Sequence, residues 1–417
     1  MRQETLVESA EKVLSLTPDE AESLRGLGSR LASRATWWGA TDPTGDRRVI
    51  AVRSQAPGRY GVRVADAVGV IAVGRLQILV EPKIPIAHLL YLLSMSGRFP
   101  RLDQSRPRLS LGESLWTLVA TWFVTSTELL LRRGLVRDYR RTVADMSAAR
   151  GHLMPLHTAQ AFYSGRLSVR CSFEEFCLDS PLNRVLRAAA TEVVASPLLD
   201  WPLRRRAMAL LDRTGEAADL QPGDTEQALQ RQTRHYEDAW VLALHVLSST
   251  GRTLAHGPNK AWTFLFRTPD MVEDGIRGLL VGGLGSSRVQ KRGIQLAGSS
   301  MTFNPDLLFD RGLAVGDVKY KISGGDWDRP DLNQAITFAE AFGASEAAIV
   351  RFRNPGTAKV PEAMIGKKRL SEITWPLDQE FSPVESGERL LDDTRSWLER
   401  VTLRSSTALP FETARRG

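Results

Sequence analysis

The sequence predicts a multidomain α+β protein: a β-rich N-terminal domain, a central helical region and a C-terminal α/β domain. Two observations carry this prediction. A chain of 417 residues is too long for one compact core. Its apolar pattern also changes along the chain, from strand-like runs to helical spacing and then to a mixture of both. We expect domains at 1–105, 106–230 and 231–381, followed by a C-terminal helix and tail at 382–417.

The composition is that of an ordinary soluble globular protein, with 42% hydrophobic and 25% charged residues. Lys and Arg outnumber Asp and Glu by 55 to 48, an excess that favours polyanion binding only weakly when it is spread over a long chain. Cys171 and Cys177 are too few for a disulfide framework and lack a second ligand pair for zinc. With no membrane-length apolar run and no signal-like N-terminus, a cytoplasmic protein without membrane contact is expected.

The first domain is predicted to begin with a helix and continue as strands. Thr17 can cap a helix over 18–33, and Pro18 fits its first turn. The segments 60–64, 68–73 and 76–80 have the composition of strands.

The middle of the chain is predicted to be helical. Apolar residues recur there at helical spacing, and Gly134 and Gly251 each follow such a stretch as a stop signal. The polar stretch 215–224, which contains Pro222 and Gly223, is typical of a linker. The expected helices span 113–133, 181–194, 201–213 and 232–250.

From Trp262 onward the pattern predicts the order αβββαβ, which is an α/β sandwich around a mixed sheet. A glycine-serine loop at 282–287 separates the first helix from the strands. The expected elements are a helix at 271–281, strands at 288–296, 303–309 and 313–321, a helix at 329–342, a strand at 347–352 and an amphipathic helix at 385–401.

Two aspartates and a lysine in this domain are candidates for chemistry. The turn signal Asp310-Arg311-Gly312 predicts a hairpin that brings Asp306 beside Asp317. Strand residues two apart share a face, so Lys319 should project with Asp317. Two carboxylates at one sheet edge repel unless a cation lies between them, and Mg²⁺ or Mn²⁺ prefers such oxygen ligands. Lys319 could then orient a water or stabilise charge on a phosphate.

The flanking helices offer further groups. Glu273 could supply a third oxygen ligand, although Asp274 beside it is a competing candidate. Gln334 could hold the attacking water or a phosphate oxygen. With Asp306, Asp317 and Glu273 as metal ligands, this set is what a metal-dependent phosphodiesterase needs. The alternative is that Asp317 and Lys319 form an exposed ion pair on a strand, which would contribute little.

Other catalytic classes lack their motifs. The sequence contains no G-x-x-x-x-G-K-[ST] phosphate loop, so the chain is not expected to hydrolyse nucleoside triphosphates by itself. It contains neither H-E-x-x-H nor G-x-S-x-G.

With these residues in view, the chain resembles the McrC family, the nuclease subunits of McrBC-type modification-dependent restriction systems, which have a PD-(D/E)xK nuclease domain. No single motif carries the resemblance; their order along most of the chain does. The matching segments are Val80-Glu81-Pro82-Lys83-Ile84, Asp179 to Leu186, Met271-Val272-Glu273, Pro305-Asp306, Asp317-Val318-Lys319 and Asp331-Leu332-Asn333-Gln334.

The resemblance implies a DNA endonuclease subunit with a GTP-hydrolysing AAA+ partner of the McrB type. The N-terminal β-rich region would dock on the partner ring and stimulate its hydrolysis, and the C-terminal domain would cut DNA, with or without a modified base. The alternative is an inactive adaptor or activator of an AAA+ motor that keeps a nuclease-like fold for DNA or partner binding. The intact set Asp306, Asp317 and Lys319 argues against the adaptor.

Overall fold

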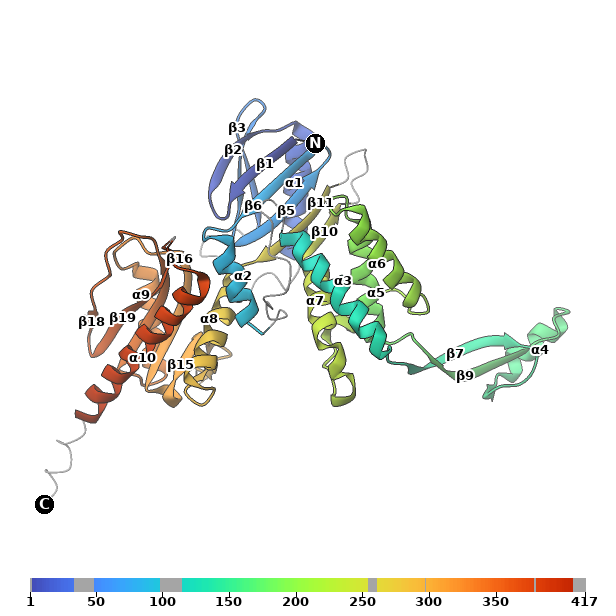
Figure 1. The fold of residues 1–417 in the computed structure, drawn as a ribbon. Coiled ribbons are helices and arrows are strands. Elements are labelled where there is room, and N and C mark those ends of the chain that lie inside the picture. The colour runs from blue at the N-terminus through green and yellow to red at the C-terminus, as the bar shows by residue number, and fades with distance from the viewer. Residues whose placement is uncertain are drawn as a thin grey trace, which may run out of the picture. The chain divides into compact units, whose positions relative to one another are not determined.

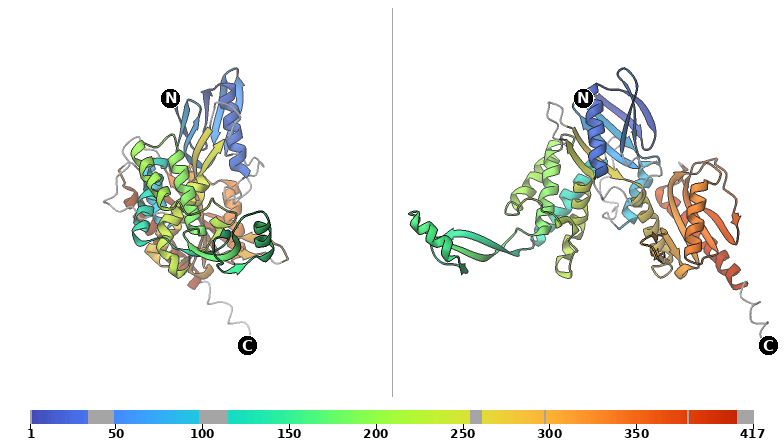
Figure 2. Two further views of the ribbon diagram at one scale, coloured as in Figure 1. Left: turned by 90° about the vertical axis from the view of Figure 1, so that its right-hand side faces the viewer. Right: turned by 180° about the vertical axis from the view of Figure 1, so that it is seen from behind.

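The computed structural model describes residues 2–33, 49–97, 115–253, 261–296, 298–378 and 380–407 (Figures 1 and 2). The chain forms two compact units, one made of residues 1–108 with 251–417 and the other of residues 109–250. The predicted boundary at residue 105 lies outside the described residues. Among the helices described, none combines the length and the apolar character needed to cross a membrane.

The first unit begins with a predominantly β domain. The predicted helix 18–33 is present as α1 (Pro18–Ser33), and Thr17 and Glu20 cap it through reciprocal bonds of 3.2 and 2.9 Å. The three predicted strands are also present, as β4, β5 and β6. A five-stranded sheet has the order β1 (Arg2–Val7), β6 (Leu76–Glu81), β5 (Ala67–Val73), β11 (Ala261–Arg267), β10 (Thr250–Thr253). A three-stranded sheet has the order β2 (Glu11–Ser15), β4 (Arg59–Val64), β3 (Ile50–Ala56).

Strands β10 and β11 belong to this first sheet, whereas the domain predicted from the sequence at 231–381 includes them. Strand β5 is buried along its whole length, so it needs a partner on each side, and β11 pairs with its free edge. The strands approach closely at Gly69, where a Cβ would lie 2.1 Å from the carbonyl oxygen of Phe264. This pairing joins segments about two hundred residues apart, which a local pattern does not reveal.

The C-terminal sheet is mixed, as predicted. Strands β16, β17 and β19 are parallel, and the outer pairs are antiparallel. Leu308 and Val315 pack under α9 (Arg329–Ala341), whereas Phe309 points to the other face and contacts Trp397 of α10 (Pro383–Thr407). The strand order is β12 (Val289–Gln290), β15 (Leu307–Phe309), β16 (Ala314–Ile322), β17 (Glu346–Arg353), β19 (Lys368–Pro376), β18 (Ala363–Ile365).

Two predicted strands are interrupted. The segments 288–296 and 303–309 each split, and their halves β13 (Ile294–Gln295) and β14 (Thr302–Phe303) pair as a separate two-stranded ribbon. Pro305 has no N–H to donate to a ladder. A Cβ at Gly293 would lie 1.9 Å from Asn304 Oδ1, so Gly293 packs closely against the Asn304 side chain. Helix α8 (Pro269–Leu284) runs into the predicted loop at 282–287.

A helix that the sequence analysis did not predict, α2 (Ile86–Met95), covers part of the C-terminal domain. It packs along α8 because two glycines leave room for its backbone. A Cβ at Gly275 would lie 2.4 Å from the carbonyl oxygen of Leu92, and one at Gly278 would lie 1.9 Å from that of Met95. The N-terminal and C-terminal domains therefore share a close-packed contact within one unit.

The second unit contains the four predicted helices as α3 (Leu115–Arg133), α5 (Pro181–Ala195), α6 (Trp201–Arg213) and α7 (Glu237–Ser249). Helix α7 packs on α3 and α5, although the sequence analysis assigned it to the C-terminal domain. An arm that was not predicted extends from these helices (Figure 1). It consists of β7 (Asp138–Met146), β8 (His152–Leu153), α4 (Pro155–Tyr163) and β9 (Val169–Cys177).

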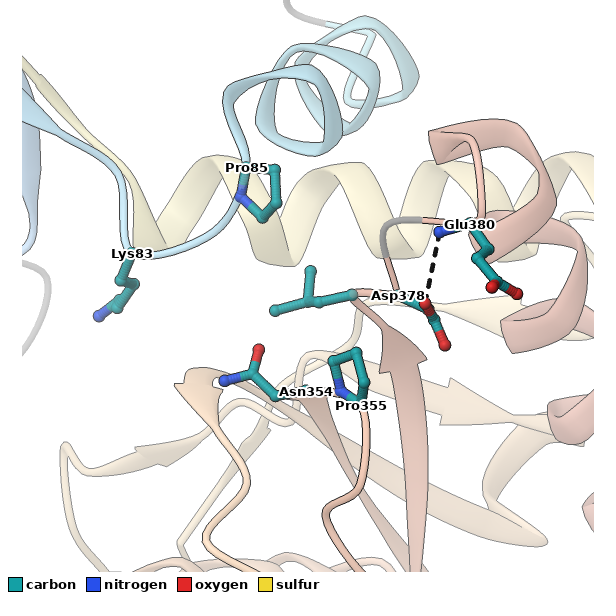
Figure 3. Close-up of a pocket in the computed structure, with 7 residues that line it drawn as sticks. Lys83, Pro85, Asn354, Pro355, Asp378 and Glu380 are labelled. Atoms are coloured by element: carbon teal, nitrogen blue, oxygen red, sulfur yellow. Dashed lines mark hydrogen bonds between the residues drawn. The ribbon is translucent and has the colours of Figure 1, made fainter.

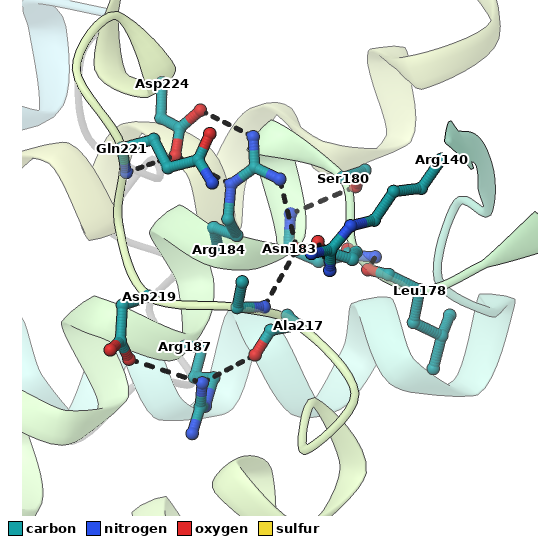
Figure 4. Close-up of polar contacts among 12 residues, drawn as sticks. Arg140, Leu178, Ser180, Asn183, Arg184, Arg187, Ala217, Asp219, Gln221 and Asp224 are labelled. Atoms are coloured by element: carbon teal, nitrogen blue, oxygen red, sulfur yellow. Dashed lines mark hydrogen bonds and ion pairs between the residues drawn. The ribbon is translucent and has the colours of Figure 1, made fainter. Parts of the chain in front are cut away.

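A buried polar network stabilises the start of α5 at the base of this arm (Figure 4). Arg184 donates to both carboxylate oxygens of Asp224 at 2.9 Å and to Asp179 at 3.1 Å. Asn183 donates to the carbonyl oxygens of Val136 and Leu178, each at 2.8 Å, and these residues flank the two long strands of the arm. The network therefore anchors the arm to the helices.

Replacing Asp224 with alanine should destabilise the second unit by about 3–5 kcal/mol, because Arg184 would keep a buried charge without its bidentate partner. Chemical unfolding followed by circular dichroism measures this change. The matched control is Asp219→Ala, because Asp219 is fully exposed and should contribute less than about 0.5 kcal/mol. Equal losses of unfolding free energy in the two variants would contradict a structural role for the network.

Candidate active site

Three carboxyl groups from three elements converge at one edge of the C-terminal sheet. Antiparallel pairing of β15 with β16 places Leu307 opposite Gly316, so Asp306 and Asp317 are the next pair along the hairpin. The backbone N–H of Val318 donates to Asp306 Oδ2 at 2.8 Å and fixes that carboxyl. Asp306 is close enough to hydrogen bond with both Asp317 and Glu273, which α8 supplies. The predicted hairpin therefore brings the two aspartates together.

Lys319 lies beside this cluster on the same side of β16. Its Nζ is 2.7 Å from Asp317 Oδ2 and donates to Gln334 Oε1 at 2.9 Å. Gln334 comes from α9, so the ammonium group links the sheet to the helix that covers it. All five predicted residues are thus brought together in the structure: Glu273, Asp306, Asp317, Lys319 and Gln334.

The competing candidate on α8 has a different partner. Asp274 forms an ion pair with Arg277, one turn further along the same helix. Glu273, rather than Asp274, contacts Asp306. The structure therefore distinguishes two adjacent acidic residues that the sequence alone left as alternatives.

Burial dominates the electrostatics of the cluster. Asp306 and Asp317 are only 8% and 3% exposed. Burial, together with the neighbouring Glu273 carboxyl, raises the pKa of Asp306 to about 6. Burial also raises the pKa of Asp317 to about 7, although Lys319 acts in the opposite direction. Burial and Asp270 raise the pKa of Glu273 to about 7. The three carboxylates can therefore all be ionised near neutral pH only if additional positive charge compensates them.

The chemical type of the donors, carboxylate oxygen, suits a hard divalent cation. In the described ranges, no three His, Cys, Asp or Glu side chains are already spaced as ligands of a metal ion, and these carboxyls contact one another instead. Carboxylate oxygens are nevertheless the ligands that Mg²⁺ and Mn²⁺ prefer. A cation between them would replace repulsion among buried like charges with attraction.

A second cation, not predicted from the sequence, lies near the cluster. Lys291, in the loop between β12 and β13, opposes the effect of burial and Asp270 and lowers the pKa of Glu273. Its side chain is exposed, so it is also accessible to an anionic ligand. Lys291 belongs to no recognisable motif, and only the path of the chain brings it near Glu273.

The tip of the arm is a second feature that the sequence analysis missed. Large apolar side chains there face solvent: Tyr163 is 87% exposed and Leu167 is 88% exposed, and Leu156 and Phe162 are also exposed. Such a cluster on a protruding element is typical of a surface that binds another macromolecule. We call these four residues the arm tip.

Substituting Asp317 with asparagine should stabilise the protein at pH 8 in EDTA. Its pKa is about 7 in the folded protein and about 4 when unfolded, so stability falls as the pH rises through this window. Without the buried charge, the free energy of unfolding of the variant should rise by about 1 kcal/mol or more, which corresponds to roughly 2–4 °C in Tm. Mg²⁺ should then raise the Tm of the wild type but not of the variant.

Thermal unfolding at pH 5 and pH 8, with EDTA or Mg²⁺, tests this expectation. The control is Asp392→Asn, because the Asp392 side chain is 71% exposed and lies on α10. If Asp317→Asn and the wild type have equal Tm values in EDTA at pH 8, the electrostatic description of the cluster is wrong.

The chain is similar to known proteins in both sequence and fold. The model of a family described as McrBC 5-methylcytosine restriction system component matches residues 62–350. A chain in the solved half-complex from a tetradecameric assembly of Thermococcus gammatolerans McrB AAA+ hexamers with bound McrC is similar in fold, with a TM-score of 0.61 and 16% identity. That alignment covers 95% of this chain and all of the other.

A chain from the solved Thermococcus gammatolerans McrBC complex aligns with a TM-score of 0.44 and 17% identity, over 69% of this chain and 89% of the other. No curated protein matches the sequence significantly.

Proposed function

Because the chain belongs to the McrBC 5-methylcytosine restriction system component family, we propose that it is the DNA endonuclease subunit of such a system. The observation that carries this proposal is the convergence of Glu273, Asp306 and Asp317 beside Lys319. Clustered buried carboxylates are costly for a protein that needs only a scaffold. Their position on a hairpin and a flanking helix is what a PD-(D/E)xK nuclease requires.

Each residue of the cluster has a distinct role in the proposed reaction. Asp306, Asp317 and Glu273 would hold Mg²⁺ or Mn²⁺, which when bound polarises the scissile phosphate and makes water more acidic. Lys319 keeps its ammonium group beside Asp317 and can donate to an attacking water or to a phosphoryl oxygen. Gln334 accepts from Lys319 and so holds the direction of that ammonium group. The exposed Lys291 can contact a neighbouring backbone phosphate.

Asp317→Ala should lower metal-dependent cleavage of methylated plasmid DNA by about 100-fold or more, because it removes a ligand and the partner of Lys319. Binding to the AAA+ partner and stimulation of its hydrolysis should persist. The assay uses the full chain assembled with the partner and nucleoside triphosphate, and Asp392→Ala serves as the exposed control. Undiminished cleavage by Asp317→Ala would remove the site assignment.

The alternative function, an inactive adaptor that activates an AAA+ motor, predicts a different result. The wild-type complex would then stimulate hydrolysis yet nick no DNA with either Mg²⁺ or Mn²⁺. The raised pKa values of three adjacent carboxyls favour the nuclease, since perturbed groups of this kind cluster at reactive sites.

The arm tip supports association with a protein partner. The related assembly contains McrB AAA+ hexamers with bound McrC, and we propose that this chain binds a GTP-hydrolysing AAA+ partner of the McrB type. The resemblance assigned docking to the N-terminal β-rich domain, and that assignment remains a prediction. The exposed side chains of the arm tip supply a second contact surface.

Changing Tyr163 and Leu167 together to serine should weaken binding of the AAA+ partner at least about tenfold, because exposed anchors of this size dominate interface energies. The Tm should not change, since neither side chain is buried. Light scattering or sedimentation of the mixed proteins measures the association, with Met364→Ser on β18 as the exposed control. Unchanged association would exclude the arm tip as a partner surface.

A further inference from the structure

A buried carboxylate joins the N-terminal strands to α8. Glu8 follows β1 and is only 2% exposed. Its Oε1 accepts a hydrogen bond from the hydroxyl of Thr268, which is fully buried. Thr268 precedes the first residue of α8, and its N–H donates to the carbonyl oxygen of Asp66 at 3.2 Å. Glu273 lies on the same helix five residues later, roughly 7.5 Å along its axis.

The same carboxylate faces the strand that carries Asp317 and Lys319. Tyr320 follows Lys319 on β16 and therefore points to the opposite face, where it is 5% exposed. Burial and the nearby Glu8 carboxylate raise the pKa of the Tyr320 hydroxyl. Lys83, which follows β6, places its Nζ 4.2 Å from the centre of the Tyr320 ring. We call Glu8, Lys83, Thr268 and Tyr320 the junction cluster.

Aromatic packing continues from this cluster across the sheet. The centre of the Tyr320 ring lies 5.6 Å from that of Phe352 on β17. The centre of the Phe352 ring lies 6.1 Å from that of Trp375 on β19. The indole N–H of Trp375 donates to His88 Nδ1 on α2 at 3.0 Å. The face of the sheet opposite α9 is thus covered in part by the N-terminal domain.

On the other side of Lys83, a pocket lies between the N-terminal and C-terminal domains. This pocket of about 460 Å³ lies between the segment of Lys83 and Pro85 and the ends of β17 and β19, where Asn354, Pro355 and Asp378 line it (Figure 3). Among the described residues, α2 and the junction cluster both bring the N-terminal domain into contact with the C-terminal domain. The junction cluster contacts α8, which carries Glu273, and includes Tyr320 of β16, the strand that carries Asp317.

We propose that Glu8 and Tyr320 are positioning residues for the active site, and that they couple the N-terminal domain to the spacing of its carboxyls. This inference rests on the proposed nuclease function. A shift of Tyr320 along the strand carries Lys319 and Asp317 with it, because they share one backbone. A shift of Thr268 carries Glu273, because a helix moves as a rigid rod. Glu8 accepts a hydrogen bond from Thr268, and Lys83 lies over the Tyr320 ring, so residues of the N-terminal domain contact both ends.

The polar character of the junction cluster indicates a geometric role. A buried carboxylate is costly, and well-packed apolar residues would hold two domains together at least as firmly. Hydrogen bonds add direction, which apolar contacts lack. Residues that orient metal ligands from behind commonly change activity or metal affinity by about 10–100-fold when they are replaced.

Two nearly isosteric changes test the proposal, Glu8→Gln and Tyr320→Phe. The matched controls are Glu11→Gln, an exposed carboxylate in the same domain, and Tyr139→Phe, which is 67% exposed. The full chain is assembled with its AAA+ partner, and kcat and KM for methylated DNA, stimulated hydrolysis and Tm are measured. Mn²⁺ affinity is measured by calorimetry on the chain alone.

We expect each junction variant to lower kcat about tenfold or more and to weaken Mn²⁺ binding severalfold. KM for DNA and stimulated hydrolysis should stay at wild-type values and the Tm should not fall, whereas every property of the controls should stay at its wild-type value. Wild-type kcat and Mn²⁺ affinity in both junction variants would overturn the proposal. A parallel fall of all properties with Tm would also overturn it, because that pattern indicates a purely structural role.

Failure of the proposed function gives a separate signature. If the wild-type complex cleaves no DNA with either cation, the nuclease assignment fails, and the Mn²⁺ affinities of Glu8→Gln and Tyr320→Phe alone decide whether the junction cluster positions the carboxyls.

Discussion

The structure depends on the burial of three acidic side chains at one edge of the C-terminal sheet. Asp306, Asp317 and Glu273 come from a hairpin and a helix, and their mutual repulsion increases as water is excluded. Only protons or additional positive charge can relieve it. Lys319 supplies part of that charge at 2.7 Å from Asp317, and Val318 supplies a backbone donor at 2.8 Å from Asp306. The remainder is what a divalent cation would bring.

The surrounding fold can be understood as support for this costly arrangement. The hairpin sets the register of the two aspartates, α8 brings Glu273 from the side, and α9 holds Lys319 through Gln334. Helix α2 and the junction cluster then connect the N-terminal domain to α8 and β16. The N-terminal domain thereby contacts the elements that carry Glu273 and Asp317.

Local sequence patterns were sufficient for most of the site. A turn signal at 310–312 and the two-residue period of a strand placed Asp306, Asp317 and Lys319 together, and helix signals placed Glu273 and Gln334 on flanking elements. The choice between Glu273 and Asp274 required the side-chain directions that Arg277 helps to set. The pairing of β11 with β5 and the contact of α2 with α8 could not be predicted, because both join distant segments. Glu8 belongs to no motif, and only tertiary structure gives it a role.

The most direct test of the central claim is anomalous diffraction from crystals of the protein soaked in Mn²⁺. The account predicts a manganese peak with carboxylate oxygens of both Asp306 and Asp317 within about 2.2 Å, and with Glu273 bound directly or through water. A fully soaked crystal without a peak between the two aspartates would contradict it.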